Sequence, residues 1–413
     1  MLEKVLNKQA SEYEVVETGI DSTEYKQFLK QSLSELNHNF EAFKSSAVVV
    51  SKAQFKELKK LNKLLNYALQ QIVANYFKDA RIREIYNLDT QLEAILKEVA
   101  SLPYKIGMYR PDIILDTEGQ TKICEVGCRY PINGWMLSYY LNKVMEKTQV
   151  LAEANKQPFK ALLEFIPTLA KEFNKEHPIF YLHHKEKGTE AYLLFKELEK
   201  LGYIIQNSFP EELELKDNEV VVGEHPAKQF VIEMDREELK NIPLELLKKI
   251  TQCKTCINDI RSIILVHDKQ VLSVLYNEEL MLSYMSAEEY SFLRKYLIPS
   301  YTLHSKEIRN SLKNTKKNWI LKRTSGGRGI DMYVKNECAP TTWNSLLEND
   351  WKNYMVQEYI AQKEIQLEEE VINVVGMLLN YNDTLLGLGI YRGSEKSIIN
   401  VHSGAYMLPS LLK

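Results

Sequence analysis

Hydrophobic residues recur at helical spacing through most of residues 20–100. One apolar face runs through residues 25–36, including Leu36, and a second runs through residues 55–68. Ser51 stands where the second helix would begin, and serine is a favoured N-cap. Residues 47–50, between the two faces, form either a strand or a short buried connector. The pattern predicts a helical layer in the N-terminal part of the chain.

The pattern then changes to that of β-strands. Residues 110–116 and 121–127 are predicted to be two strands of a hairpin joined at residues 117–120. A two-residue or a four-residue loop centred there gives the same register, in which paired residue numbers sum to 237. The many apolar residues of both strands indicate that the hairpin is largely buried.

In this register Asp112 faces Glu125, and Arg110 faces Gly127 on the same side. Opposed side chains have Cβ atoms roughly 5 Å apart, so two carboxylates repel unless a cation lies between them. Mg²⁺ is a suitable cation because it binds one or two carboxylates together with substrate phosphates. The alternative is a solvated edge hairpin whose acids face water.

Residues 176–262 alternate between short apolar strands and helices. The predicted strands cover residues 179–182, 203–205, 220–222 and 230–232, and the predicted helices cover residues 189–201 and 236–250. Such alternation is typical of a parallel sheet. This stretch is therefore predicted to be a separate α/β unit.

A glycine-rich loop follows in the last third of the chain. Lys322 ends a strand at residues 319–321, and a second strand is predicted at residues 330–334. The loop between them contains Ser325, Gly326, Gly327 and Gly329. Glycines let backbone N–H groups approach a polyanion, and a nearby lysine supplies a charge. An ordinary glycine-rich turn is the alternative.

The remaining strands carry a second candidate feature. Residues 354–360 are predicted to be a short apolar strand with Gln357 and Glu358 near its end. Backbone and side-chain groups at such a position can form hydrogen bonds to the edge of an adenine that lies between apolar walls. Further strands are predicted at residues 371–379, 384–391 and 398–402.

The composition argues against a nucleic-acid-binding protein and against a membrane protein. The chain of 413 residues has 53 Lys and Arg against 56 Asp and Glu, a net charge of −3, so no basic surface for nucleic acid is indicated. No apolar run reaches the length of a membrane span, and residues 1–17 lack the apolar core of a signal peptide. Five cysteines are expected to be free thiols. We expect a cytoplasmic protein without a membrane partner.

Taken together, the motifs resemble the ATP-grasp family, in the circularly permuted branch that includes glutathionylspermidine synthase. The carboxylate hairpin comes first here and the adenine hinge comes near the end, which is the permuted order. The resemblance implies a mixed α/β (α+β) fold. It also implies three parts, which are a helical layer with the metal-binding half (1–175), a small pre-ATP-grasp domain (176–262) and the ATP-binding half (263–413).

The resemblance also assigns roles by position. It puts Lys269 and Lys322 on the ATP phosphates, and makes Asp112 and Glu125 the Mg²⁺ ligands. The loop over the phosphates would consist of Ser325, Gly326, Gly327 and Gly329, and the adenine hinge of Gln357, Glu358 and Ile360.

The implied reaction is the ATP-dependent joining of a carboxylate, in a small molecule or a peptide, to an amine through an acyl phosphate. Arg110, Lys322 and Arg392 would be the catalytic cations. Gly127 departs from the family, which has Asn there, and this favours a second hypothesis of nucleotide binding without turnover. A third is phosphate transfer to a hydroxyl. The acid, the amine and the oligomeric state are not readable from the sequence.

Overall fold

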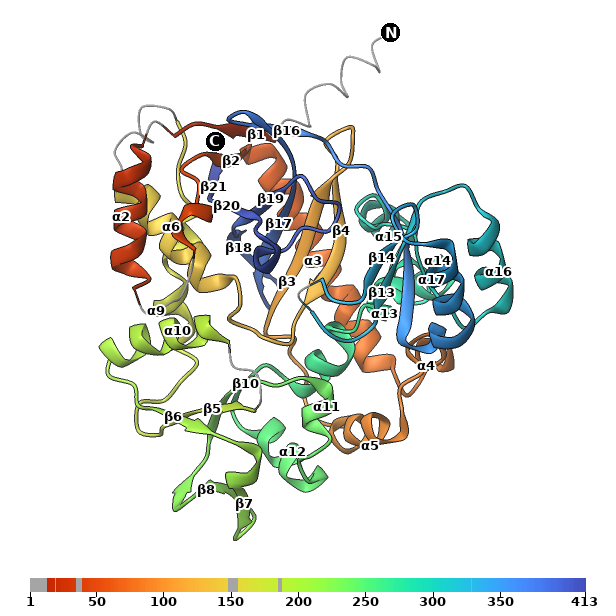
Figure 1. Ribbon diagram of the computed structural model, residues 1–413. Coiled ribbons are helices and arrows are strands. Elements are labelled where there is room, and N and C mark those ends of the chain that lie inside the picture. Colours follow the sequence, from red (N-terminus) through yellow and green to blue (C-terminus); the bar gives the residue numbers. More distant parts are fainter. Residues whose placement is uncertain (1–12, 19, 35–38, 148–154, 185–187, 328) are drawn as a thin grey trace.

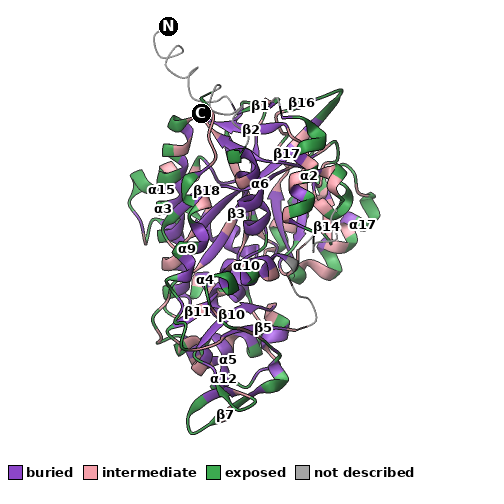
Figure 2. Ribbon diagram, turned by 90° about the vertical axis from the view of Figure 1, so that its left-hand side faces the viewer, coloured by how far each residue is buried: buried purple, intermediate pink, exposed green. Residues whose placement is uncertain are grey.

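The computed structural model describes residues 13–18, 20–34, 39–147, 155–184, 188–327 and 329–413. Its largest sheet joins segments that are far apart in the chain, as Figure 1 shows for β3, β4 and β17. The sheet is antiparallel, with the order β20-β19-β17-β3-β4, while β16 and β18 also pair with β17. Its strands are β3 (Met108–Leu115), β4 (Thr121–Gly127), β16 (Ile365–Leu367), β17 (Glu370–Tyr381), β18 (Thr384–Leu388), β19 (Tyr391–Ser394) and β20 (Tyr406–Leu408). These strands are mostly buried (Figure 2).

The hairpin β3–β4 has the predicted register at the candidate site but not at its turn. Asp112 pairs with Glu125 and Arg110 with Gly127, as expected, whereas Leu115 pairs with Thr121. The paired numbers therefore sum to 236 near the turn, which makes the prediction of a two- or four-residue loop wrong. Beyond this pair the Asp116 N–H donates to the Gln120 carbonyl at 3.0 Å, so the loop itself has three residues, with Gly119 at φ +77°. A bulge at Cys124 restores the sum of 237.

A second antiparallel sheet carries the glycine-rich loop. Its strands β12 (Ser300–Thr302), β13 (Trp319–Arg323), β14 (Met332–Val334) and β15 (Tyr354–Glu358) have the order β12-β15-β13-β14. β14 begins two residues later than predicted, and Asp331 before it has φ +55°. The helices α16 (Lys306–Asn314) and α17 (Pro340–Ser345) belong to the same part of the chain. A small core centred on Leu321, Trp343 and Val356 holds this sheet against them.

The predicted α/β unit contains a parallel sheet of four strands. They are β5 (Ile179–His183), β6 (Ile205–Ser208), β10 (Gln229–Glu233) and β11 (Thr255–Ile257), in the order β11-β10-β5-β6. The prediction placed residues 220–222 in this sheet, which is wrong, because they lie in a separate antiparallel sheet of β7 (Leu213–Lys216), β8 (Glu219–Val222) and β9 (His225–Pro226). The single helix predicted for residues 236–250 is two helices, α11 (Arg236–Leu239) and α12 (Leu244–Gln252), since Pro243 stands between them.

The N-terminal part is mainly helical, as expected. Ser51 caps α3 (Lys52–Asn75) in a reciprocal pair with Gln54, and Ala47–Val50 forms the strand β2. The predicted helix around residues 25–36 is α2 (Ser22–Ser32), and Leu36 lies outside the described residues. The remaining elements here and nearby are β1 (Glu14–Val16), α4 (Ala80–Tyr86), α5 (Thr90–Val99), α6 (Trp135–Lys147), α8 (Lys160–Leu163), α9 (Phe165–Ala170) and α10 (Thr189–Lys200).

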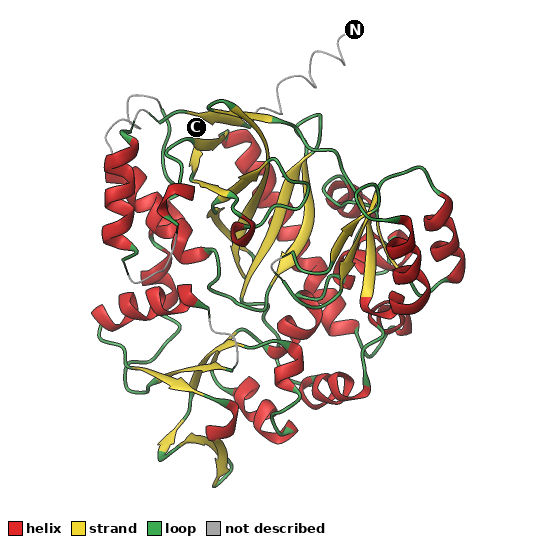
Figure 3. Ribbon diagram, in the orientation of Figure 1, coloured by secondary structure: helices red, strands yellow, loops and turns green. Residues whose placement is uncertain are grey.

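Helices surround the sheets in Figure 3, so the architecture is the mixed α/β arrangement that was predicted. The last part of the chain adds α13 (Gln270–Tyr276), α14 (Glu278–Met281), α15 (Ala287–Arg294) and β21 (Ser410–Leu412). Residues 398–402 were predicted to be a strand, which is wrong, since Val401–Ser403 forms a 3₁₀ turn capped by Asn400. All five cysteines are free thiols. None of the described helices is long and apolar enough to cross a membrane.

Candidate functional site

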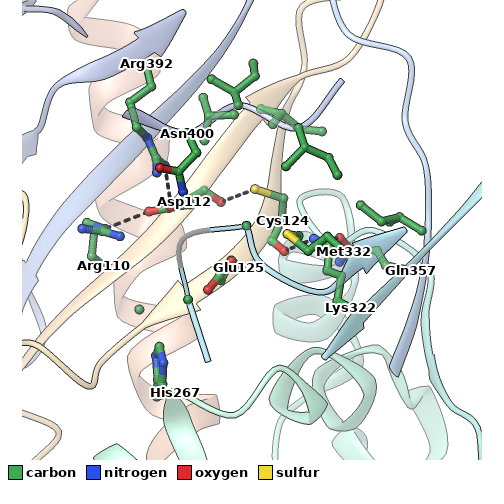
Figure 4. Close-up of a pocket in the computed structure, with 18 of the residues that line it drawn as sticks. Arg110, Asp112, Cys124, Glu125, His267, Lys322, Met332, Gln357, Arg392 and Asn400 are labelled. Atoms are coloured by element: carbon green, nitrogen blue, oxygen red, sulfur yellow. Dashed lines mark hydrogen bonds and ion pairs between the residues drawn. The ribbon is translucent and has the colours of Figure 1, made fainter. Parts of the chain in front are cut away.

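A cavity of about 320 Å³ is lined by residues of the two antiparallel sheets and the loops next to them (Figure 4). One part of its wall is apolar and consists of Ile114, Ile298, Ile360, Val375 and Ile399, four of which form a buried cluster of their own. The other part carries Arg110, Asp112, Glu125, Lys322 and Arg392. A flat apolar group and a polyanion can therefore be bound side by side. We call this the nucleotide cavity.

Asp112 lies between two arginines. Its Oδ1 accepts a hydrogen bond from Nε of Arg110 at 2.9 Å, and its Oδ2 accepts one from Nη2 of Arg392 at 2.5 Å. Burial alone would lower the pKa of Arg392, but Asp112 raises that pKa above its usual value. Both carboxylate oxygens of Asp112 are thus held by guanidinium groups (Figure 4).

Glu125 has a different partner. Its Oε1 lies 3.2 Å from Nζ of Lys269, which also donates a hydrogen bond to the carbonyl oxygen of Gly326 at 3.0 Å. Burial would raise the pKa of Glu125, but Lys269 and Lys322 lower it below its usual value. Lys269 therefore links the carboxylate hairpin to the glycine-rich loop.

Lys322 contacts neutral acceptors. Its Nζ donates to the carbonyl oxygen of Cys124 at 2.8 Å and to Oε1 of Gln357 at 2.7 Å, and the Gln357 amide donates to Ser300. Burial lowers the pKa of Lys322 below its usual value. An ammonium has three donors, so one N–H remains for a ligand in the cavity.

This arrangement changes the role expected of Gln357. Its side chain is buried and accepts a hydrogen bond from Lys322, so it is not free to contact adenine. Hydrogen bonds to adenine at this strand would have to come from backbone groups after Gln357. Glu358 and Ile360 do line the nucleotide cavity beside the apolar wall. The Glu358 carboxylate points to Lys317, with which it forms an ion pair at 3.0 Å.

The glycine-rich loop separates two cavities. Gly329 lines the nucleotide cavity, Ser325 and Gly326 line a second cavity, and Gly327 lines both. Gly326 and Gly329 have φ values of +103° and +69°, which glycine adopts without strain. The predicted loop residues thus lie together around the border between the cavities.

Residues 129–135, after β4, are held by a buried carboxylate. Glu190, on α10, accepts hydrogen bonds from the backbone N–H groups of Gly134, Met136 and Leu137 at 2.7, 3.0 and 3.0 Å. It therefore caps the start of α6 from a distant part of the chain. Burial raises the pKa of Glu190 above its usual value.

The sequence analysis assigned no role to several residues of the site. Arg129 and His267 line both cavities, and Asn400 lies beside Arg392 and Asp112 in Figure 4. His267 is two residues before Lys269, and Asn400 lies in the strand predicted at residues 398–402. Neither residue type nor spacing identified them as site residues. Arg129 belongs to the polar loop of residues 129–135, directly after β4. The second cavity also measures about 320 Å³.

The donor set fits a magnesium ion only in part. No group of three or more His, Cys, Asp or Glu residues that could hold a metal occurs among the described residues. Glu125 offers one carboxylate oxygen beyond its contact with Lys269, which suits a Mg²⁺ that keeps waters and substrate phosphates as its other ligands. Asp112 would first have to release an arginine.

Comparisons with known proteins found a similar family model and a similar enzyme. A family model described as the AnkG N-terminal domain matches residues 61–265. The chain is 21% identical over 425 residues to the ATP-grasp enzyme ankG of Aspergillus thermomutatus, covering 88% of this chain and 88% of that enzyme. It is thus similar to an ATP-grasp enzyme along nearly its whole length.

Among solved structures, a glutathione synthetase-like effector (GSS30) from Globodera pallida, in its apo form, superimposes with a TM-score of 0.60 at 11% identity. The match covers 97% of this chain and 100% of that chain. At this identity the match shows a shared fold alone. A putative gamma-glutamylcysteine synthetase from Methylobacillus flagellatus KT has a TM-score of 0.44 at 12% identity, over 83% of this chain and 86% of that one, which is too low to support an argument.

Proposed function

Because the chain belongs to the ATP-grasp family, we propose that it is an ATP-dependent ligase that joins a carboxylate to an amine and releases ADP. The observation that carries this proposal is the nucleotide cavity, in which an apolar wall meets four cationic side chains, Arg110, Arg129, Lys322 and Arg392. The permuted order of the chain and its three domain boundaries stay predictions.

The proposed binding mode follows from the two parts of the wall. Adenine would lie against the apolar wall beside Glu358 and Ile360, and the phosphates would point to Lys322. Lys269, whose Nζ contacts Glu125 and the Gly326 carbonyl, would be the second lysine near the phosphates. Mg²⁺ bound with the nucleotide would neutralise phosphate charge, and Glu125 would be its ligand from the chain. The glycine-rich loop would exclude water from the phosphates, which protects an acyl phosphate from hydrolysis.

The proposed reaction has two steps. A carboxylate oxygen of the substrate forms a bond to the γ-phosphorus while the bond from that phosphorus to its bridging oxygen breaks, and ADP leaves with the electron pair. The amine nitrogen then bonds to the acyl carbon, phosphate leaves with the electrons of the broken C–O bond, and the nitrogen loses a proton. Arg110 and Lys322 would stabilise the charge on the transferred group, and Arg392 would hold Asp112 in place.

A second candidate function is nucleotide binding without turnover. It is favoured by Gly127, which replaces a family asparagine, and by the two arginines that hold both oxygens of Asp112. In that case the protein would bind ATP and release no ADP with any pair of acid and amine.

A thermal-unfolding assay with ATP, with and without Mg²⁺, tests the shared premise of both candidates. A ligand at a hundred times its Kd stabilises a fold by about 2.7 kcal/mol. We expect a shift that is largest with Mg²⁺ and that Lys322→Ala abolishes. Lys313→Ala, which removes a partly exposed lysine paired with Glu348, is the control and should keep the full shift.

Release of ADP in the presence of acids and amines then separates the ligase from the binding protein. A shift in wild type that persists in Lys322→Ala would contradict the proposed phosphate site. The absence of any shift in wild type would contradict the nucleotide cavity itself.

A further inference from the structure

The peptide group that joins Asn133 to Gly134 lies between a carboxylate and a guanidinium. Its N–H, on Gly134, donates a hydrogen bond of 2.7 Å to Oε1 of Glu190, and its carbonyl, on Asn133, accepts one of 2.8 Å from Nη1 of Arg110. The negative side chain is thus bound at the positive end of the peptide dipole, and the positive side chain at the negative end. Hydrogen bonds in such a chain polarise and strengthen one another.

Arg110 is oriented by two contacts. Its Nε donates to Asp112 at 2.9 Å (Figure 4), and its Nη1 donates to the Asn133 carbonyl. These contacts use two of the five N–H donors of a guanidinium, so those on Nη2 are left for a ligand. The Arg110 side chain is 19% exposed and lines the nucleotide cavity. Its direction in the cavity therefore depends on where Asp112 and the Asn133 carbonyl lie.

Residue 134 has to be a glycine for this arrangement. Its φ is +87°, where a side chain is strained, and a Cβ there would lie 2.9 Å from Nη1 of Arg110 and 2.8 Å from Sδ of Met377. The Arg110 side chain therefore packs directly against the Gly134 backbone. A shift of this backbone would move the guanidinium.

The contact of Glu190 with Gly134 goes beyond the capping of a helix. Glu190 also accepts the N–H groups of Met136 and Leu137 at 3.0 Å each, which are the second and third residues of α6 and the usual partners of a cap. Gly134 precedes the helix, and its bond to Glu190 is the shortest of the three. This third bond fixes the orientation of the Asn133–Gly134 peptide.

Glu190 and Arg110 also influence each other electrostatically. Burial raises the pKa of Glu190, and Arg110 is among the groups that oppose this shift. Glu190 lies on α10, whereas Arg110 lies on β3 of the largest sheet. The peptide therefore connects a buried acid in the α/β unit to a cation of the nucleotide cavity.

We propose that Glu190 is a positioning residue, which holds the Asn133–Gly134 peptide so that Nη2 of Arg110 points to the γ-phosphate of a bound nucleotide. This rests on the proposed function, in which Arg110 stabilises the charge on the transferred group. Glu190 itself does not line the nucleotide cavity. Its effect on binding is therefore confined to nucleotides that carry a γ-phosphate.

The experiment compares two nucleotides by isothermal titration calorimetry on the full chain with Mg²⁺. AMP-PNP is a non-hydrolysable ATP analogue that keeps a γ-phosphate, and ADP lacks one. Wild type should bind AMP-PNP at least about tenfold more tightly than ADP, as expected for charge-assisted hydrogen bonds to the added phosphate. The ratio of the two affinities reports the position of Arg110, because a general loss of stability would not change it.

Glu190→Gln removes one of the two acceptor atoms while the side chain keeps its shape. The remaining oxygen should face the two N–H groups of α6, which leaves Gly134 without its acceptor. The preference for AMP-PNP should then fall at least about threefold, while the affinity for ADP stays as in wild type. Arg110→Met should remove most of this preference, and adding Glu190→Gln to Arg110→Met should change the ratio no further.

Glu197→Gln is the matched control. Glu197 lies on the same helix and accepts a hydrogen bond of 2.9 Å from the hydroxyl of Tyr140, later in α6. This variant removes another contact between the same two helices and should leave the ratio of affinities unchanged. Glu190→Asp keeps the charge on a shorter side chain. It is used if the amide variant does not fold, and it should lower the ratio in the same direction.

The outcomes separate the two proposals. If wild type binds neither nucleotide, the proposed function fails, and the role of Glu190 fails with it. If wild type binds both nucleotides equally, Arg110 does not contact the γ-phosphate, and only the inference is overturned. It is also overturned if Glu190→Gln keeps the preference for AMP-PNP, if it weakens both nucleotides equally, or if its effect on the ratio persists in Arg110→Met.

Discussion

The nucleotide cavity and the second cavity are neighbours with similar volumes but different walls. The charged residues of the nucleotide cavity come largely from strands of two sheets, including β3, β4, β13 and β19. The wall of the second cavity comes from residues at helix starts and in loops, such as Asp235 before α11 and Asp268 before α13. The backbone hydrogen bonds of a sheet fix the direction of the side chains on its strands. The direction of side chains in loops depends on single hydrogen bonds, such as those at helix starts. The first cavity is therefore expected to be the more rigid.

The largest effect should come from the charges on the strand wall. Asp112→Asn leaves Arg110 and Arg392 without a buried counter-charge, so it should lower the free energy of unfolding by about 3 kcal/mol. Glu125→Gln should cost about 1 kcal/mol, because that carboxylate is 23% exposed and has one lysine partner. Urea unfolding of the two variants measures the difference. Equal losses would show that the two arginines are not the reason for the stability of this wall.

A buried acid, Glu233, ends β10 two residues before Asp235 of the second cavity. Glu233 accepts hydrogen bonds from the Tyr181 hydroxyl at 2.7 Å and from the Gly188 N–H at 2.9 Å, and burial raises its pKa to about 7. A raised carboxyl pKa stabilises the fold below the unfolded value of 4.5, and this contribution is lost as the pH rises to about 7.

Relative to Glu233→Gln, wild type should therefore lose about 3 kcal/mol of unfolding free energy between pH 4.5 and pH 7. Urea unfolding of both proteins across this range measures it. Glu199→Gln, on the exposed side of α10, controls for the loss of one negative charge. A constant difference between wild type and Glu233→Gln at all pH values would contradict the raised pKa.

The smallest effect on stability should come from the loop between the cavities. Gly326→Ala introduces a Cβ at φ +103°, where no atom lies within 4 Å, so only backbone strain of about 1 kcal/mol is expected. Gly223→Ala has the same open surroundings at φ +61° in the turn between β8 and β9, and is the control. Only Gly326→Ala should weaken the stabilisation by AMP-PNP. An equal effect of both variants would show that the loop has no part in nucleotide binding.

The two cavities also differ in how far the sequence predicts them. The pairing of Asp112 with Glu125 was predicted from a two- or four-residue loop centred on residues 117–120, and it is correct because the bulge at Cys124 offsets the error in the loop. The three-residue turn was missed because the bulge at Cys124 compensates for it, and no residue type marks a bulge.

The sequence contains no such pattern for the second cavity. Asp235 is an ordinary helix cap when judged from its neighbours, and its distance from Arg129 depends on how two loops pack. The same holds for His267, whose unsatisfied Nε2 becomes visible only when Cys128 is seen at Nδ1. Contacts between loops distant in the chain are set by tertiary packing, which local propensity does not describe.

The bulge in β4 has one more consequence. It supplies the Cys124 carbonyl that Lys322 contacts, and so ties the strand wall of one sheet to a lysine of the other. Every residue type carries a backbone carbonyl, so no substitution at position 124 removes this acceptor. Deleting the residue would remove it, although Glu125 would then still face Asp112 in the register set by the turn. The contact therefore depends on the number of residues in the strand and not on the residue type at position 124.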